Sequence, residues 1–334
     1  MTDVVTGAKP DVVIPVSDGP ASYVTRWQQS PILADVARFH RPGFFFNEVE
    51  HLGQQGGPFH LLTAVNQRSG RADARCAFFV LGNVALSPAA APFGSVEFAE
   101  NLPDPVLNEL LQTLIGTVQN TGVQTLRLVN YPHCYAPKQA DRLARRLSAL
   151  GFEIVRDDAT HFLPVTGESF DQNLHPSERR RLRKCRNAGF AFAHWPAPDV
   201  DEVITFLTET RQRLGYRLTI APDRLVNLLR QFPNNFPVFV VRDGDAIAAL
   251  TVAVRVRSDI LYAFLPASGA DYRTFSPTVL LVDGLYTYCR QQDIRLLDLG
   301  VSLDADGQSK PGLVRFKRNL GALTSPKWTF EKTL

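Results

Sequence analysis

Hydrophobic and polar positions along the chain follow two spacings, and segments of the two kinds alternate. Apolar residues three and four positions apart are typical of an amphipathic helix, and short apolar or alternating runs are typical of a strand. These spacings predict helices at 104–122, 139–151 and 276–293, and strands at 75–86, 123–130, 259–267 and 294–300, with a two-stranded hairpin around an Asp-Gly turn at 237–256. Such alternation implies a mixed α/β architecture.

The same order of elements occurs twice. Residues 110–130 and 280–300 each have the pattern of a helix followed directly by a strand, and strands of antiparallel appearance precede each of them. The chain has 334 residues, more than one hydrophobic core usually holds. We therefore predict two similar α/β domains, 1–165 and 166–334, joined by the polar stretch 165–177.

Composition excludes several classes of protein. The net charge of +3 is too small to indicate a nucleic-acid binder from the whole chain. The four cysteines form no CxxC pair, so neither a zinc site nor a secreted disulfide framework is indicated, and we expect no metal. The first twenty residues lack the pattern of a signal peptide, and no run of about 18 apolar residues occurs. We expect a cytoplasmic protein without a membrane span.

A short helical pattern near the C-terminus carries a lysine on its apolar side. Phe316, Lys317 and Leu320 lie on one stripe at about 100° per residue. An ammonium on that side needs an anion, a carbonyl group or a path to water. The simplest interpretation is a side chain whose head reaches solvent or pairs with Asp298 or Asp304.

The highest density of positive charge lies in a second short helix, predicted at 177–189 with Ser177 as its N-cap. Arg179, Arg183 and Arg186 stand at i, i+4 and i+7 and therefore share one face. Three guanidinium groups in a row are suited to phosphate or carboxylate groups. A solvated row of charges is an equally good interpretation of the pattern.

No glycine-rich phosphate loop of the dinucleotide-binding or P-loop type occurs in the sequence. The nearest candidate is 273–278, RTFSPT, where Thr274 and Ser276 precede a predicted helix. The free N–H groups of a helix N-terminus attract anions. Serine followed by proline is also a common way to begin a helix. Neither HExxH nor GxSxG occurs, so hydrolase chemistry is not indicated.

These segments together resemble the Fem-type aminoacyl transferases and the FemAB-like members of the GNAT acyltransferase superfamily. The stretch 178–189, ERRRLRKCRNAG, is similar to the family's TRYNIRKAEKSG, and 312–322, GLVRFKRNLGA, is similar to its GLYRFKKGFGG. A weaker similarity joins 87–98 to the family's SPFGG region. The matching positions of the two main motifs are Arg179, Arg183, Lys184, Gly189, Gly312, Leu313, Arg315, Phe316, Lys317, Arg318 and Gly321.

The resemblance implies two tandem GNAT-like domains and transfer of an acyl or aminoacyl group to an amine. The donor would be acyl-CoA or an aminoacyl-tRNA, the acceptor a small-molecule or peptide amine, and no cofactor would be tightly bound. Lys317 would neutralise charge on the reacting carbonyl or on a phosphate, and Asp298 is a candidate catalytic residue. Substrate would be bound by Arg179, Arg183, Lys184, Arg315 and Phe316, and the nucleotide of an acyl-CoA by Arg273, Thr274, Ser276 and Thr278.

Two features depart from the family pattern. The glycines of the GNAT pyrophosphate loop, [QR]xxGx[GA], are missing from RTFSPT, and the segment 199–235 is too short for the long helical hairpin of some tRNA-dependent members. Two alternatives therefore stay open: a non-catalytic binding module on a decayed transferase fold, and an RNA-binding protein that uses the arginine row. We expect a monomer in either case.

Overall fold

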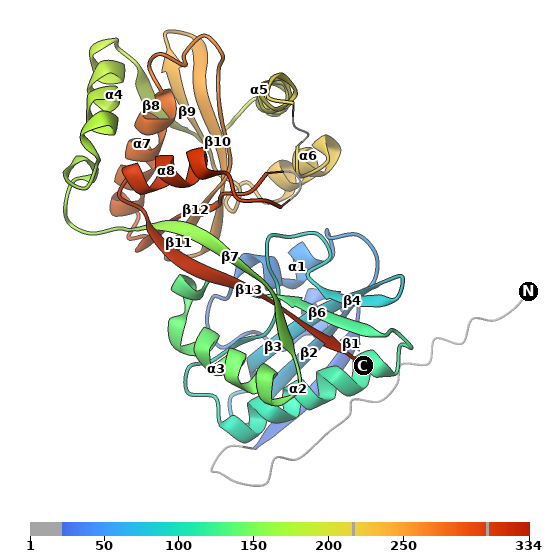
Figure 1. Cartoon of the computed structure of the whole chain (residues 1–334). Helices are drawn as coiled ribbons and strands as arrows, with labels where there is room; N and C mark the ends of the chain where they lie inside the picture. The colour runs from blue at the N-terminus through green and yellow to red at the C-terminus, as the bar shows by residue number, and fades with distance from the viewer. Residues whose placement is uncertain (1–21, 216–217, 305–306) are drawn as a thin grey trace, which may run out of the picture. The chain divides into compact units, whose positions relative to one another are not determined.

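The structure is a computed structural model that describes residues 22–215, 218–304 and 307–334 (Figure 1). The first twenty residues, which lack a signal-peptide pattern, lie outside the described residues. The chain divides into two compact units, unit 1 up to Asp157 together with Lys327–Leu334, and unit 2 from Asp158 to Pro326. The boundary after residue 165 stays a prediction.

Unit 1 contains a mixed sheet in the order β1-β2-β3-β4-β6-β13, with β5 beside β3. Its pairs are antiparallel except for the parallel pair β4–β6. Helices α2 and α3 share one hydrophobic core with the strands. The elements are β1 (Tyr23–Gln29), η1 (Leu33–Asp35), η2 (Phe45–Asn47), α1 (Val49–Leu52), β2 (Phe59–Asn66), β3 (Arg71–Leu81), β4 (Val84–Ser87), β5 (Glu97–Phe98), α2 (Asp104–Gln119), β6 (Thr125–Val129), η3 (His133–Tyr135), α3 (Pro137–Ala149) and β13 (Leu323–Thr333).

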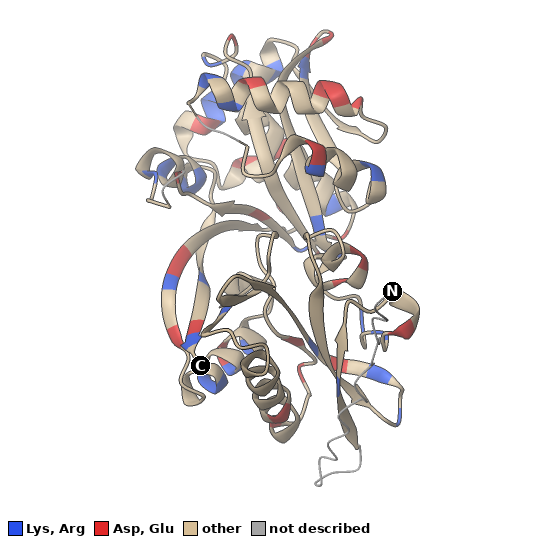
Figure 2. Cartoon of the chain, turned by 90° about the vertical axis from the view of Figure 1, so that its right-hand side faces the viewer, with Lys and Arg blue, Asp and Glu red and all other residues tan. Residues whose placement is uncertain are grey.

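The strands of unit 2 follow one another in the order β7-β12-β11-β10-β9-β8 and are also of mixed direction. The pair β11–β12 is parallel and the other pairs are antiparallel. Charged residues of both signs are interspersed along the chain, in keeping with the small net charge (Figure 2). The elements are β7 (Glu153–Pro164), η4 (Phe170–Gln172), α4 (Pro176–Asn187), β8 (Ala191–Trp195), α5 (Val200–Arg213), α6 (Pro222–Gln231), β9 (Val238–Asp243), β10 (Ala246–Arg257), β11 (Ile260–Ser268), α7 (Pro277–Gln291), β12 (Leu296–Val301) and α8 (Pro311–Asn319).

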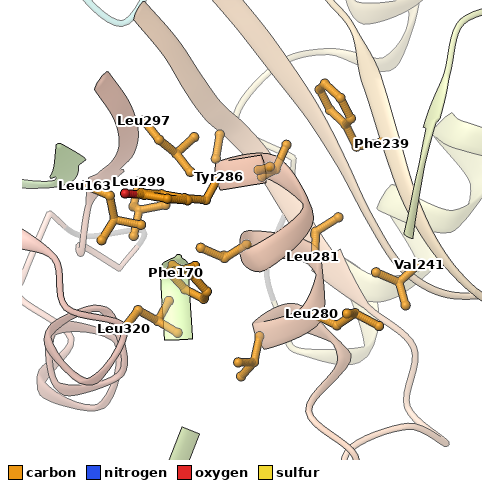
Figure 3. Close-up of a cluster of buried hydrophobic side chains, with 14 of the residues drawn as sticks. Leu163, Phe170, Phe239, Val241, Leu280, Leu281, Tyr286, Leu297, Leu299 and Leu320 are labelled. Carbon is orange, nitrogen blue, oxygen red and sulfur yellow. The ribbon is translucent and has the colours of Figure 1, made fainter. Parts of the chain in front are cut away.

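Helix α7 is the centre of the unit 2 core. Its buried side chains pack with residues from β7, β9 and β12, as Figure 3 shows for Tyr286 of α7 beside Leu163 of β7 and Leu297 of β12. Phe170 and Leu174 belong to the same core, so the stretch 165–177 is anchored in unit 2. The stretch predicted as a polar linker thus buries its sparse apolar residues in unit 2, and its role as a joint between domains stays a prediction.

Most sequence-predicted elements are confirmed within a few residues. The predicted helices at 104–122, 139–151 and 276–293 are α2, α3 and α7, and the hairpin at 237–256 is β9–β10. The segment 199–235 holds two short helices, α5 of 14 residues and α6 of 10 residues. Among the described residues, no helix has both the length and the apolar character needed to cross a bilayer.

Two local predictions are wrong. The strand predicted at 75–86 is interrupted, because the chain turns back after β3 through Gly82, which has a φ of 60°. The N-cap of α4 is His175 instead of Ser177, since the His175 ring accepts a hydrogen bond from the Ser177 N–H at 3.3 Å and Pro176 occupies the first helical position. Each case depends on a contact that the hydrophobic pattern does not encode.

We expect opposite effects from two glycine-to-alanine substitutions in helices. Gly116→Ala in α2 places its Cβ where no atom lies within 4 Å, so it should stabilise unit 1 by about 0.5–1 kcal/mol through helix propensity. Gly284→Ala in α7 places its Cβ 2.1 Å from Cγ of the Phe192 ring. The overlap should outweigh propensity and destabilise unit 2 by about 1–3 kcal/mol.

Denaturant unfolding followed by fluorescence and circular dichroism measures both changes. Stabilisation by Gly284→Ala equal to that by Gly116→Ala would contradict the close contact of α7 with β8.

Candidate functional site

Lys317 is the buried residue of α8, with 5% of its surface exposed. The predicted inward orientation is confirmed, and Leu320 on the same stripe is also buried. The Lys317 Nζ donates to the backbone oxygens of Gly300 and Val301, each at 2.8 Å. Of the three solutions that the sequence allowed for this ammonium, the fold uses backbone carbonyls.

The two carbonyls can meet one ammonium because β12 is irregular at that point. In a regular strand successive carbonyls point to opposite sides, so one Nζ could not bind both. The pairing of β12 with β7 shifts register between Asp298 and Gly300, and Gly300 has a φ of 74°. A Cβ at Gly300 would lie 2.9 Å from the Tyr262 ring, so glycine is required by both conformation and space.

Asp298 holds this bulge in place. Its Oδ1 accepts the Gly300 N–H at 2.7 Å and the Thr160 hydroxyl at 2.9 Å, and 2% of the residue is exposed. The carboxylate also raises the pKa of Tyr262, after the larger effect of burial. Asp298 thus fixes the backbone that binds Lys317, and it is near enough for its charge to act on the pKa of the lysine, after the larger effect of burial. A catalytic role for Asp298 stays a prediction.

The same place is where two parallel strands separate. Strands β11 and β12 are paired from Ile260↔Leu296 only as far as Tyr262↔Asp298, although β11 runs on to Ser268 and β12 to Val301. Ligands of α/β sheets commonly bind beyond the carboxyl ends of parallel strands. Gly300 and Val301 lie two and three residues beyond Asp298, the last paired residue of β12, so Lys317 binds β12 where the two strands separate.

The charge state of Lys317 is sensitive to its burial. Burial lowers the pKa of Lys317 to about 8, and the negative charge of Asp298 opposes that change. An ammonium has three donors, and the carbonyls of Gly300 and Val301 take two of them. In the described part of the chain the third N–H has no acceptor, so it is available to a ligand.

His161 is a member of the site that sequence analysis missed. It lies on β7 opposite Gly300, is 1% exposed, and its Nδ1 is 3.5 Å from the Ser302 hydroxyl. Its Nε2 is buried and makes no hydrogen bond within the described residues. Burial lowers the pKa of His161, the charges of Lys317 and Arg318 lower it further, and the Gly300 carbonyl opposes them.

The loop before α7 holds the predicted nucleotide-binding residues. Arg273 and Thr274 are exposed, and Ser276 and Thr278 are half-buried. Ser276 is the N-cap, with a φ of 57° and no side-chain capping hydrogen bond, so the first-turn N–H groups gain no acceptor from it. This helix end offers donors to an anion without the glycines of the usual loop.

Helix α4 braces that loop. The Lys184 Nζ donates to the Thr274 carbonyl at 2.9 Å and lies 4.5 Å from the centre of the Phe275 ring. The Cys185 Sγ donates to the Phe275 carbonyl at 3.1 Å. Lys184 thus supports the loop that was predicted to bind the nucleotide.

The arginine row of α4 divides among different partners. Arg179 donates to the backbone oxygens of Asp171, Gln172 and Leu174, and Arg186 forms an ion pair with Asp283 at 2.9 Å. Arg183 is exposed and has no hydrogen bond or ion pair to another described residue. Binding of phosphate by Arg179 and Arg183 stays a prediction, and Arg183 is the member that is free to do it.

The two remaining candidates on α8 lie in different surroundings. Arg315 is exposed, and Phe316 is half-buried against the unit 2 core. All four cysteines are buried and none forms a disulfide, and no group of three or more metal-ligating side chains occurs in the described ranges. The structure thus forms two groups, one around Lys317 on β7, β12 and α8, and one around Thr274 on α4 and α7.

Most residues of the two groups lie in a part of the chain that matches a known domain family. Residues 176–318 match a family model described as an acetyltransferase (GNAT) domain. This range includes α4, the loop before α7, β12 and α8, whereas Thr160 and His161 precede it. No curated protein sequence matches the chain.

Solved structures share the fold across most of the chain. FemX is similar with a TM-score of 0.67 and 14% identity, covering 88% of this chain and 93% of its own. A C-terminal domain (DUF2156) from Agrobacterium fabrum, assigned to a lysylphosphatidylglycerol synthetase, has a TM-score of 0.56 and 13% identity over 85% and 86%. A tandem GNAT protein from the clavulanic acid biosynthesis pathway has a TM-score of 0.50 and 14% identity over 82% and 83%. The predicted tandem GNAT-like fold is confirmed.

We expect the Lys317→Met substitution to change how stability depends on pH. The pKa of Lys317 is about 8 in the folded protein and near 10.5 when the chain is unfolded, so the unfolded state binds more protons between these values. The wild type should therefore gain about 3 kcal/mol, relative to the variant, as the pH rises from below 8 to above 10.5.

Guanidinium unfolding gives the free energy of unfolding of both proteins at several pH values. Subtracting the value for the variant from that for the wild type isolates the contribution of Lys317. A difference that does not depend on pH would contradict the burial of a charged Lys317.

Proposed function

We propose that this protein, an acyltransferase of the Fem-like branch of the GNAT superfamily, transfers an acyl group from acyl-CoA to a primary amine where β11 and β12 separate. The acceptor is a small molecule or a peptide. The observation that carries the proposal is the buried Lys317 ammonium with an unused N–H at the start of this opening.

Lys317 suits the stabilisation of a developing oxyanion. Attack of an amine on a thioester moves negative charge to the carbonyl oxygen, and a fixed donor in a dry site stabilises that charge strongly. The Gly300 and Val301 carbonyls orient the ammonium before the substrate arrives. Asp298 supports this arrangement by holding the Gly300 N–H and by offsetting part of the lysine charge.

The start of α7 suits the phosphates of the donor. One short segment carries several groups that can bind an anion. They are the first-turn N–H groups of α7, the exposed Arg273, and the hydroxyls of Thr274 and Ser276. Lys184 supports that loop from α4, and Arg183 adds an exposed guanidinium to the same helix. This loop, α7 and the parallel strands β11 and β12 belong to the part of the chain that matches a GNAT domain. GNAT domains commonly use acyl-CoA as substrate, which supports acyl-CoA as the donor.

An aminoacyl-tRNA is the other donor that the resemblance implies. FemX and the lysylphosphatidylglycerol synthetase domain share the fold at low identity, which does not choose between donors. Two of the three arginines in the row on α4, Arg179 and Arg186, are engaged within the protein and are not free to meet an RNA backbone. We therefore favour the smaller phosphate-bearing donor.

Lys317→Met should lower the rate of acyl transfer about 10²–10³-fold without unfolding the protein, because one oxyanion donor is lost. Formation of acetohydroxamate from acetyl-CoA and hydroxylamine measures the rate. In the wild type the rate should also fall as the pH rises through about 8, where Lys317 loses its proton. Lys138→Met, which changes an exposed lysine paired with Glu100, is the matched control.

Wild-type activity in Lys317→Met would reject the role of the lysine.

Calorimetric titration with acetyl-CoA tests the donor. Arg273→Ala should weaken binding several-fold, since it removes an exposed charge beside the α7 N-terminus. Arg290→Ala, at the opposite end of the same helix, should leave binding unchanged. Equal effects of the two variants would refute this binding site, and absence of binding by the wild type would move the donor to an aminoacyl-tRNA.

A further inference from the structure

We propose that His161 is the general base of the transfer reaction and that its Nε2 takes the proton lost by the attacking amine. This assignment rests on the proposed function and adds to it the residue that moves the proton.

The geometry of the ring leaves one nitrogen for a substrate. Nδ1 lies 3.5 Å from the Ser302 hydroxyl, whereas Nε2 is buried and makes no hydrogen bond to any described residue. If Nε2 carried the proton, a buried N–H would lack an acceptor, which is the costlier arrangement. The favoured tautomer has its proton on Nδ1, donated to Ser302, and a lone pair on Nε2.

The position of the ring relates it directly to Lys317. His161 pairs with Gly300 across β7 and β12, and the Gly300 carbonyl accepts a hydrogen bond from Lys317 at 2.8 Å. The same carbonyl acts on the His161 ring, raising its pKa. Lys317, which would bind the carbonyl oxygen of the substrate, and His161, which would take the proton, therefore both lie next to the Gly300 peptide group.

The charges around the ring keep it neutral. Burial lowers the pKa of His161, and Lys317 and Arg318 of α8 lower it further. The nearby carboxylate of Asp298 on β12 uses its Oδ1 to accept hydrogen bonds from the Thr160 hydroxyl and the Gly300 N–H. A neutral imidazole can accept a proton at neutral pH, which a general base requires.

Asp298 is less suited to this role. Its Oδ1 already accepts two short hydrogen bonds, from the Gly300 N–H at 2.7 Å and from the Thr160 hydroxyl at 2.9 Å. This oxygen is therefore committed to holding the bulge. Its predicted place in the site is retained as the residue that positions the Gly300 peptide.

The proton balance of the step is complete. The amine nitrogen forms a bond to the acyl carbon, the bond from that carbon to the CoA sulfur breaks, and the nitrogen loses one proton to Nε2. The imidazolium returns that proton to the departing thiolate or to water, so the products are an amide and free CoA. No oxidant, reductant or further reactant is consumed.

Chemical rescue tests the assignment. His161→Ala should lower acetohydroxamate formation at least about 100-fold, and added imidazole should recover at least about tenfold of that loss by occupying the space of the ring. Imidazole should not recover Lys317→Met. His194→Ala, at an exposed histidine of β8, is the control and should keep wild-type activity.

His161→Gln provides a second variant if the alanine protein does not fold. It should lower kcat while leaving KM for acetyl-CoA nearly unchanged, and it should abolish the acidic limb of the pH profile. Wild-type kcat in a folded His161 variant, or an acidic limb unchanged in His161→Gln, would overturn the proposal.

Nitrogen-15 NMR of the wild-type ring separates this inference from the proposed function. The His161 signals are identified by their absence in His161→Gln. An unprotonated Nε2 and a protonated Nδ1 at pH 7 support the assignment even if acetyl-CoA is not the donor. A protonated Nε2 at that pH would refute it, whatever the activity.

Discussion

The buried ammonium of Lys317 is the constraint on which the site depends. A charge in that position is costly unless acceptors are fixed around it. The Gly300 and Val301 carbonyls can both serve only because β12 bulges after Asp298, and the bulge needs both the left-handed Gly300 and the Asp298 carboxylate that holds its N–H. One lysine thus determines the conformation of a strand end.

This arrangement also links the protonation of two side chains. Lys317 lowers the pKa of His161, and Asp298 opposes the fall in the pKa of Lys317. Between the two pKa values the lysine is charged and the histidine neutral, which is the pair of states that amine acylation needs. Pairs of titratable groups whose environments separate their pKa values are typical of acid–base sites.

The sequence predicted the parts of this site that depend on local spacing. The inward side of α8 followed from the positions of Phe316, Lys317 and Leu320, and α7 began at Ser276 and Pro277 as expected. What it could not predict comes from partners far apart in the chain. The Thr160 hydroxyl meets Asp298 across 138 residues, and a single histidine in the largely polar strand β7 gives no signal that its partner is β12.

The arginine row shows the opposite limit of sequence reasoning. Helical spacing correctly placed Arg179, Arg183 and Arg186 on α4, but spacing carries no information on acceptors. Arg179 meets three carbonyls of the segment before its own helix, and Arg186 meets Asp283 of α7. The spacing of the arginines therefore predicts which face of the helix they share, whereas the fold determines which of them remain available to a ligand.

Strand β7 gives this chain a feature that the matched domain alone does not supply. The family match begins at residue 176, after β7 has ended, yet β7 pairs with β12 and brings Thr160 and His161 to the bulge. Thr160 steadies the carboxylate that holds the bulge, and His161 is the proposed base. The lysine is thus carried by a segment common to the family model, whereas the proton acceptor comes from a strand outside it. An antiparallel neighbour of β12 can change the acid–base chemistry of the site without altering the strands and helices of the matched domain.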